Sequence, residues 1–595
     1  MSSRDVLHNR TDNDRFCVTI LPVTDPSCPR SLPWRRPETT VESVGSERIL
    51  NDPPDRHDIW NQPWWLFLLM VLLFLGLVAA SIGVHAAVCS SKPIVTDPIT
   101  DAAFTKLLIR EQLSTMYIGR GANTTMCSIP RLSVDGIGPS WSLTSETVSM
   151  SNLNFVLGDR ILLSVSNALQ ALVDFGVQST LGIEQSVAPG RIRLIDVPQA
   201  DIFLAQLSAG TTTVESQRGF QRGRGLSIPM IVGGNLPDIT SDYNTDLIGA
   251  IDTAKNVVFM LQDACLRARH GNETRNSCGD CLENNNLSVL SEMTEVEYGV
   301  IASNNHFEHH MHSLLVEPGI PVRLRVYNSA SGTNFFLNIT SDDVFVESKL
   351  IAIDGHWIAP IDVNTLTERL WVGVGQRMDI LVFVPNRRWT RILILAVEEG
   401  REFGRQTGMS LQTDMSMSSS RTVKDPPRLG ESALYKSWGT ELVARKPIFG
   451  NGLEEYEVEL TNPAELTNSA AHSVLTADVN AVLYLDNQNT VNGRRGTNTS
   501  NATYVHVTLG NQVSITFVSN ATEALPMRVY GHSFTISRLN GKVVESGIER
   551  DTVLIPPKNN VTISFTALNP GSFPIACMNE FRRAKGMVAY LEYVI

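Results

Sequence analysis

The feature that most constrains this chain is an apolar segment near its N-terminus. Residues 64–84 (WWLFLLMVLLFLGLVAASIGV) form a run of 21 residues that contains no charged side chain. At 1.5 Å per residue a helix of this length spans about 31 Å, close to the roughly 30 Å hydrocarbon core of a bilayer. The sequence therefore predicts one transmembrane helix over residues 63–88 and a single-pass membrane protein.

The flanking sequences leave the orientation of this segment open. Basic residues are nearly balanced across it, and consensus sites for N-glycosylation occur on both sides, eight after it and one before it, at similar density. We interpret the segment as an uncleaved signal anchor. On this interpretation the long C-terminal part forms an ectodomain that is extracellular or lumenal.

Composition excludes several classes of protein. The 595 residues include 61 acidic and 49 basic side chains, for a net charge of −12, and contain no basic block, so we expect no nucleic-acid partner. A hydrophobic content of 43% is typical of a folded chain. Eight cysteines are too few for a disulfide scaffold.

Most of the chain after the apolar segment has the pattern of β-sandwiches. Short β-branched runs such as residues 160–166 and 513–518 alternate with Gly, Asn and Asp turns every 8–15 residues or so. Residues 103–116 (AFTKLLIREQLSTM) have instead the pattern of a short helix. The predicted regions are a disordered tail at 1–62, the transmembrane helix at 63–88, a stem at 89–140, sandwiches at 141–245, 246–400 and 446–595, and a linker at 401–445.

Three parts of this region carry motifs that match one known family. In the middle, residues 316–330 (VEPGIPVRLRVYNSA) precede Asp354-Gly355 and residues 374–379 (VGQRMD). Earlier in the chain, Gly210-Thr211 and residues 225–232 (GLSIPMIV) occur in matching order. Near the C-terminus, residues 531–534 (GHSF) look like a histidine box, and Cys577 with Met587 looks like a terminal copper motif.

Together these motifs resemble the multicopper oxidases, the family of laccases, ascorbate oxidases and ferroxidases. The resemblance covers about residues 145–595. It implies an all-β fold of three tandem cupredoxin-like Greek-key β-sandwich domains, here preceded by one transmembrane helix. It also implies copper chemistry, in which a blue-copper centre passes electrons to a trinuclear cluster that reduces oxygen.

That chemistry needs a particular set of ligands. A blue-copper centre uses two imidazoles, a thiolate and often a Met, and the family's cluster uses eight imidazoles in four His-x-His pairs, which place both rings on one side of a strand. Carried onto this sequence, the eight cluster positions fall on Gly182, Glu184, Glu215, Gln217, Arg528, Tyr530, Ala576 and Met578. The blue-copper imidazoles fall on Leu525 and Arg582, while Cys577 and Met587 match the thiolate and the thioether.

A count that needs no alignment points the same way. Of the 12 His, three lie at or before residue 88, and the nine that follow are fewer than the ten that the chemistry requires. We therefore expect a catalytically inactive relative with no cofactor. Its ectodomain would have a structural or recognition role, with a protein or polysaccharide partner.

Charged residues replace some of the missing ligands. Glu184, Glu215 and Arg528 would converge on one cavity between domains. Unpaired buried charges are costly. We therefore predict a Glu–Arg network that holds the first sandwich against the third, with a degenerate, solvated cleft as the other interpretation.

Other residues keep a metal role open. His306, His309, His310 and His312 lie within seven residues and fit either a surface metal site or a polar loop. Cys577 and Met587 fit either a soft copper site or a buried core. These alternatives correspond to a copper-binding oxidoreductase or copper-handling protein with a reduced, non-standard site.

The spacing of three cysteines leaves a further alternative. Cys265, Cys278 and Cys281 fit a disulfide, a zinc site completed by His270, or free thiols. The zinc interpretation would make the ectodomain a zinc-stabilised one. The disulfide would require the oxidising compartment that the predicted orientation implies.

Overall fold

The computed structural model describes most of the predicted β region. Two of the predicted regions, the tail at 1–62 and the transmembrane helix at 63–88, lie outside the described residues. Among the described helices, none is both long enough and apolar enough to cross a membrane. The described residues are 103–118, 125–135, 153–156, 161–178, 183–197, 210–216, 218–233, 243–270, 273–276, 293–304, 306–307, 312–341, 346–363, 370–399, 406–414, 477–497, 499–543 and 548–594.

The first sandwich has a four-stranded sheet in the order β2-β1-β4-β7 and a five-stranded sheet in the order β3-β9-β8-β5-β6. Side chains along β4 alternate between buried and half-buried positions, as expected for a strand with one face on a core. The strands are β1 (Ala103–Ile118), β2 (Thr125–Asp135), β3 (Leu153–Val156), β4 (Ile161–Asn167), β5 (Val173–Gln178), β6 (Ile183–Val187), β7 (Ile192–Val197), β8 (Gly210–Ser216) and β9 (Ser227–Gly233).

The predicted helix at residues 103–116 is wrong, because this segment is strand β1. It pairs with β2 and runs parallel to β4. Leu107 and Ile109 are buried in the core of the first sandwich, whereas Leu108 between them is 38% exposed. The first sandwich therefore includes residues 103–118 and 125–135, which the sequence assigned to a stem.

The second sandwich follows helix α2 (Thr245–Thr253), which begins after the N-cap Asn244. Its sheets have the orders β13-β12-β10-β15-β20-β17-β18, with β11 paired to β10, and β14-β22-β21-β16-β19. The strands are β10 (Lys255–His270), β11 (Glu273–Asn276), β12 (Met293–Ser303), β13 (His306–Phe307), β14 (His312–Leu315), β15 (Val322–Asn328), β16 (Phe335–Ser341), β17 (Ser348–Ile353), β18 (His356–Asp362), β19 (Leu370–Val372), β20 (Arg377–Val382), β21 (Arg391–Glu398) and β22 (Gln406–Gln412).

Strand β22 also corrects the predicted linker, which began at residue 401. Residues 406–412 pair with both β21 and β14, and the side chains of Met409 and Leu411 are buried in the second core. The Gly, Ser and Thr content of this strand hid the alternation of Met409 and Leu411 from the sequence pattern. The second sandwich therefore extends to residue 412.

The third sandwich has the sheets β23-β25-β31-β27-β28, with β29 paired to β27, and β24-β33-β32-β26-β30. Its helices are η3 (Thr499–Asn501) and α7 (Glu580–Lys585). The strands are β23 (Val479–Leu485), β24 (Thr503–Val507), β25 (Gln512–Ser519), β26 (Leu525–Val529), β27 (Phe534–Leu539), β28 (Lys542–Val543), β29 (Glu549–Arg550), β30 (Thr552–Ile555), β31 (Asn560–Thr566), β32 (Ser572–Cys577) and β33 (Val588–Tyr593).

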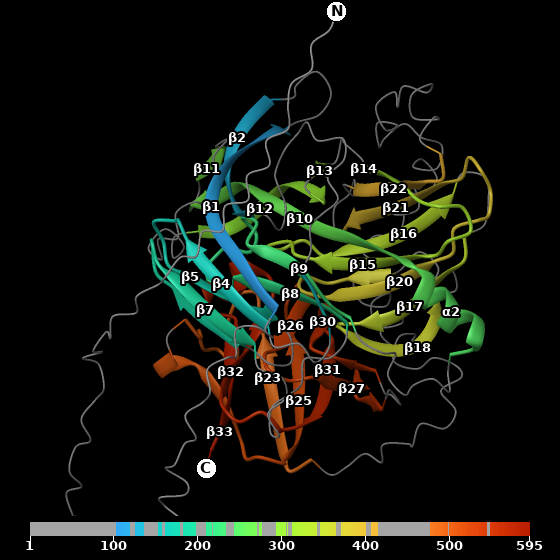
Figure 1. The fold of residues 1–595 in the computed structure, drawn as a ribbon. Helices are drawn as coiled ribbons and strands as arrows, with labels where there is room; N and C mark the ends of the chain where they lie inside the picture. Colours follow the sequence, from blue (N-terminus) through green and yellow to red (C-terminus); the bar gives the residue numbers. More distant parts are fainter. Residues whose placement is uncertain are drawn as a thin grey trace, which may run out of the picture. The chain divides into compact units, whose positions relative to one another are not determined.

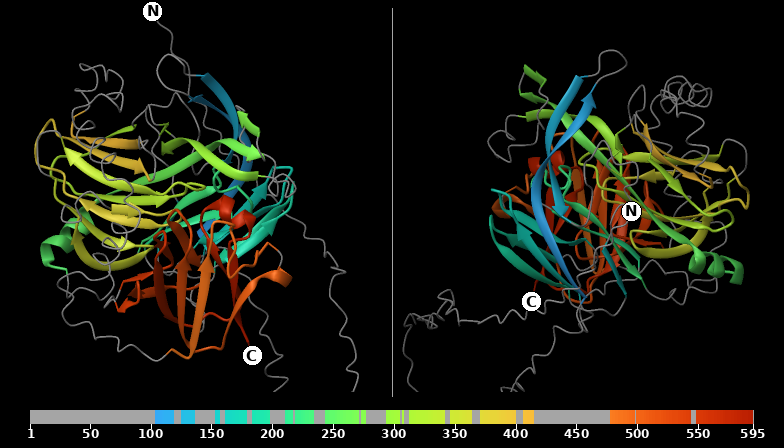
Figure 2. Two further views of the ribbon diagram at one scale, coloured as in Figure 1. Left: turned by 180° about the vertical axis from the view of Figure 1, so that it is seen from behind. Right: turned by 45° about the horizontal axis from the view of Figure 1, so that its top comes forward.

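The same pairing pattern occurs in all three sandwiches. Among the described strands, each sheet contains one parallel pair: β1 with β4, β3 with β9, β10 with β15, β14 with β22, β23 with β25, and β24 with β33. The sequence colours separate these groups into blue-teal, green-yellow and orange-red strands (Figure 1), and Figure 2 shows the same grouping from two other directions. Each sandwich also has its own apolar core.

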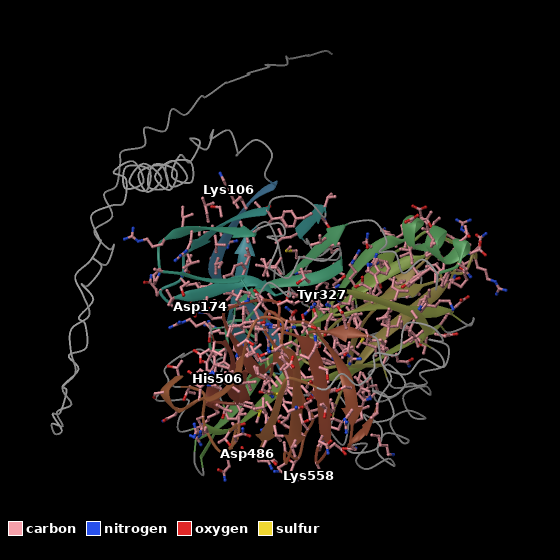
Figure 3. The ribbon with its side chains drawn as sticks, turned by 90° about the horizontal axis from the view of Figure 1, so that it is seen from below. Lys106, Asp174, Tyr327, Asp486, His506 and Lys558 are labelled. Carbon is pink, nitrogen blue, oxygen red and sulfur yellow. The ribbon has the colours of Figure 1, made fainter. Side chains whose placement is uncertain are left out.

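Polar side chains join the first two sandwiches. Tyr327 on β15, labelled in Figure 3, is fully buried and donates a hydrogen bond to the Met230 carbonyl at 3.4 Å. Thr211 on β8 donates to Asp379 on β20 at 2.5 Å. Burial alone would raise the pKa of Asp379, but Arg323 and Arg325 lower it, so this carboxylate stays charged at the junction.

Candidate functional site

Two of the positions that match cluster ligands meet between the first and third sandwiches. Glu215 on β8 and Arg528 on β26 are each about 2% exposed, and Arg528 Nη1 lies 3.6 Å from Glu215 Oε1. Arg528 also donates through Nη2 to the Gly375 carbonyl of the second sandwich at 2.5 Å. The Glu–Arg contact predicted from the sequence is therefore present, and it involves all three sandwiches.

A second arginine and a second glutamate extend this contact. Arg222 Nη1 lies 3.9 Å from Glu215 Oε1, and Arg222 Nε lies 3.8 Å from Glu580 Oε1. Arg222 Nη2 donates to the Met578 carbonyl and, at 3.2 Å, to the Ala330 carbonyl. One buried guanidinium thus contacts main-chain or side-chain groups of every sandwich.

Glu580, the first residue of helix α7, ties the same region together through its other oxygen. Its Oε2 accepts hydrogen bonds from the Gly223 amide at 3.0 Å and from the Ser331 hydroxyl at 2.8 Å. Gly223 belongs to the first sandwich and Ser331 to the second. Burial raises the pKa of Glu580, and the Arg222 guanidinium opposes that rise.

A pair of aspartates completes the network on the side of the second sandwich. Asp551 accepts a hydrogen bond from Arg377 Nη2 at 2.5 Å and lies 3.4 Å from Arg528 Nε. Burial would raise the pKa of Asp551, but Arg377 and Arg528 lower it to about 2. Asp354, in the turn before β18, has a pKa raised to about 6 by burial and by the charge of Asp551.

The other positions of the third sandwich that match cluster ligands hold weakly polar and apolar side chains, which lie beside this network. Tyr530, Ala576 and Met578 pack in one buried cluster. The Tyr530 hydroxyl donates to the Met578 sulfur at 3.3 Å, and burial raises the Tyr530 pKa. Gly375 lies so near that a Cβ there would approach the Met578 methyl group to 2.8 Å.

The positions that match the blue-copper centre separate into two environments. Leu525, Cys577 and Met587 are fully buried in the third core. Arg582 instead forms polar contacts, donating to Glu523 Oε1 at 2.5 Å and to Asn489 at 3.0 Å. Burial raises the pKa of Cys577 to about 11, so this residue is a neutral thiol at pH 7.

Several predicted positions are not tested by these contacts. Gly182 and Gln217 lie outside the described residues, and Glu184 is described only by its backbone, which pairs with Gly176. His309 and His310 also lie outside them, and only the backbones of His306 and His312 are described, in β13 and β14. The side chains of Cys265, Cys278 and Cys281 lie outside as well.

Sequence reasoning missed most of the residues that surround Arg528. Arg222, Asp551 and Glu580 match no ligand position, and Glu215 and Arg528 are 313 residues apart in the chain. The only available signal was indirect. A buried arginine at a ligand position requires counter-charges, and those of Arg528 come from strand β8 and from Asp551 between β29 and β30.

Comparison with known proteins gives a consistent result. Residues 470–594 match the sequence model of the family described as "Multicopper oxidase". The Mycobacterium tuberculosis protein named "Multicopper oxidase MmcO" is 21% identical over 534 residues, which cover 88% of this chain and 96% of that protein.

The chain is similar to the multicopper oxidases.

Solved structures show the same fold. A single-substitution mutant of the laccase from B. aclada matches with a TM-score of 0.54 and 16% identity, covering 82% of this chain and 87% of that one. The Campylobacter jejuni multicopper oxidase, titled a metallo-oxidase, matches with a TM-score of 0.52 and 14% identity, covering 83% and 92%. The predicted all-β, cupredoxin-like architecture is therefore confirmed.

These relatives contradict the expectation of no cofactor. The relatives described above are named as multicopper oxidases or a laccase, so copper is the cofactor of the proteins that this chain resembles. The prediction rested on ligand positions and on a histidine count, and the loss of one ligand set does not remove every way in which a chain binds copper. As a statement about the whole chain it is wrong.

The described cluster positions nevertheless do not fit the family's trinuclear copper cluster. Arg528 and Arg222 carry positive guanidinium groups that have no lone pair to offer a metal, and they flank the Glu215 carboxylate. Ala576 offers no donor atom. Among the described residues, no three His, Cys, Asp or Glu side chains gather in the way that holds a metal ion.

Proposed function

We propose that this multicopper oxidase-like protein does not reduce oxygen at the trinuclear position, where a buried ion network stands instead. The observation that supports this most directly is the contact between Arg528 and Glu215, two residues at former imidazole positions. In the family, the copper ions bound at this position reduce oxygen. A guanidinium there excludes a cation by charge and supplies no ligand in its place.

The proposed work of the network is structural. The ion pairs among Glu215, Arg222, Arg377, Arg528 and Asp551 join the three sandwiches and need all three to be in place. Buried ion pairs often contribute little net stability, because desolvation offsets their attraction, but breaking one is costly. The network therefore fixes the relative arrangement of the sandwiches, and the resulting surface would carry a recognition role toward a protein or a polysaccharide.

The proposal is tested by the redox behaviour of the purified full-length chain. The chain is loaded with copper, and copper content, absorbance near 600 nm and oxygen uptake with a phenol or ferrous ion are measured beside an active laccase. We expect no oxygen uptake at any copper loading. Copper-dependent oxygen uptake at turnover rates comparable to those of the laccase would overturn the proposal, whereas copper bound without turnover agrees with it.

We also propose that residues 63–88 anchor the protein in a membrane as a single pass, with the C-terminal ectodomain extracellular or lumenal. The support is the uncharged apolar run at residues 64–84 and its length. Alkaline extraction of membranes from cells that express the full chain should leave the protein in the pellet. Protease added outside intact cells or vesicles distinguishes the two orientations, since the ectodomain is cleaved only if it faces the protease.

A further inference from the structure

A serine, a histidine and a glutamate form a connected chain where the second and third sandwiches meet. Ser533 Oγ lies 2.9 Å from His356 Nε2. The other ring nitrogen, His356 Nδ1, lies 3.4 Å from Glu549 Oε2. A hydroxyl on one imidazole nitrogen and a carboxylate on the other is the arrangement by which a base activates a serine nucleophile.

Local structure positions each of the three groups. His356 is the first residue of β18, after the Asp354-Gly355 turn, in which both residues have a positive φ. Ser533 precedes β27 and follows Gly531, whose φ is +72°. Glu549 begins β29, which pairs with β27 so that Thr535 is opposite Glu549. Two turns and one strand pair therefore fix the geometry.

The protonation state of His356 suits a base. Burial lowers its pKa, Glu549 and Asp551 oppose that change, and Arg377 adds to it. The ring is therefore neutral at pH 7, with one nitrogen able to accept the Ser533 proton. Its side chain is 17% exposed and that of Glu549 is 59% exposed, so the chain of contacts reaches the surface.

We propose that Ser533, His356 and Glu549 form an acyl-transfer site for small, unhindered esters. Ser533 Oγ attacks the ester carbonyl carbon while its proton passes to His356 Nε2. The bond from that carbon to the leaving oxygen then breaks as the same proton passes to the alcohol. A water molecule, deprotonated by His356, releases the carboxylic acid and restores Ser533.

The three residues have different roles in this step. Ser533 is the nucleophile, and His356 is the general base and acid. Glu549 is a positioning residue that holds the imidazole through Nδ1, and its high exposure makes its electrostatic contribution small. Because Ser533 is half-buried, only short acyl groups such as acetyl would reach it. The inference is independent of copper and of the proposed loss of oxygen reduction.

The test uses the purified full-length chain and a fluorophosphonate probe, which forms a covalent bond to an activated serine with loss of fluoride. Peptide mass spectrometry should place the label on Ser533, and p-nitrophenyl acetate should be hydrolysed in parallel. His356→Gln keeps a hydrogen-bonding side chain but removes the base, and should slow labelling by about 100-fold or more. Glu549→Gln should slow it by a smaller factor.

Ser537→Ala provides the matched control. Ser537 lies on β27, the strand that Ser533 precedes, is half-buried, and donates to the Thr562 carbonyl at 3.2 Å. This variant should label Ser533 and hydrolyse the ester at the wild-type rate. If the probe leaves Ser533 of the folded wild-type chain unmodified, or modifies it equally fast in folded His356→Gln, the proposal is wrong.

Discussion

At the residue scale, the junction of the three sandwiches leaves no room for added atoms. Gly223 lies against Ser331 and Glu580, and a Cβ on it would overlap the Ser331 hydroxyl and lie 2.6 Å from Glu580 Oε2. The close approach lets the Gly223 amide reach that carboxylate. The glycine is therefore required by packing between domains rather than by its own backbone angles.

Gly223→Ala should lower the free energy of unfolding by about 1–3 kcal/mol, because overpacking forces a shift at the junction. Chemical denaturation of the full-length chain measures this. Gly249→Ala is the control, since Gly249 lies in helix α2 with open space around it. This substitution should raise the free energy of unfolding by up to about 1 kcal/mol. Equal effects of the two substitutions would contradict the packing argument.

Arg528→Met should cost about 3–5 kcal/mol, because it leaves the buried carboxylates of Glu215 and Asp551 with one cation fewer. The comparison is Arg388→Met, which breaks an ion pair with Asp414 on a side chain that is 77% exposed. That substitution should change stability very little. Denaturant midpoints of both variants check the difference, and a harmless Arg528→Met would argue that Arg528 does not hold the network.

The raised pKa of Asp354 predicts a pH dependence of stability. The folded carboxyl, with a pKa of about 6, binds a proton that the unfolded chain releases near 3.8, so stability falls as the pH rises through this window. Asp551, with a pKa lowered to about 2, has the opposite effect. Its charge stabilises the folded chain, and this contribution is lost only as the pH falls below about 4. Asp354→Asn should therefore flatten the slope between pH 4 and 6.

Urea denaturation at pH 4, 5, 6 and 7 measures that slope. Asp252→Asn serves as the control, because Asp252 lies exposed on helix α2 and should leave the slope unchanged. A slope in Asp354→Asn equal to that of the wild type would assign the pH dependence to other groups.

At the element scale, strand β1 shows how a sequence pattern misleads. Its apolar residues fit a helical face, but pairing with β2 and β4 places Ile109 in the core and leaves Leu108 at 38% exposure. A helix interior would have grouped its buried residues three or four apart. The alternation of buried and exposed neighbours is the signature of a strand.

Ile109→Ala should therefore destabilise the first sandwich by about 2–4 kcal/mol, because it opens a cavity in a packed core. Leu108→Ala, one residue away, should cost far less. Thermal unfolding of the full-length chain with each substitution makes the comparison. A stem that lies outside the sandwich would make both substitutions harmless.

At the scale of the whole molecule, the sandwiches are joined by buried polar contacts and by small apolar clusters. Each sandwich has a large apolar cluster, and smaller ones join the first to the second and the second to the third. Glu580 bridges all three through Gly223, Ser331 and Arg222. The joint behaviour of the sandwiches depends on these contacts more than on any one core.

Glu580→Ala should therefore uncouple the sandwiches. Calorimetry of the full-length chain should show the unfolding transition broaden or split, because the cores then unfold at different temperatures. Glu592→Ala, which removes an exposed partner of His506, is the control and should leave the shape of the transition unchanged. If Glu580→Ala unfolds in the same way as the wild type, the coupling lies elsewhere in the interface.

Sequence patterns alone located many strands and the order of the motifs. β4 and β25 fall within one residue of the runs predicted at 160–166 and 513–518, because alternating β-branched residues between turns have few other solutions. Strands β1 and β22 were missed. Their composition is helix-like in β1 and polar in β22. Each forms a strand by pairing with a strand distant in the chain, β1 with β4 and β22 with β14.

The sequence by itself determined the all-β sandwich architecture and the family likeness, and it predicted which residues stand at the positions of the cluster ligands, since these depend on local periodicity and on residue identity at fixed spacings. Tertiary structure decided what the replacements do. Arg528 meets Glu215, and Ser533 meets His356, across 313 and 177 residues of chain. Such contacts depend on how separate sandwiches pack, and no local pattern encodes that packing.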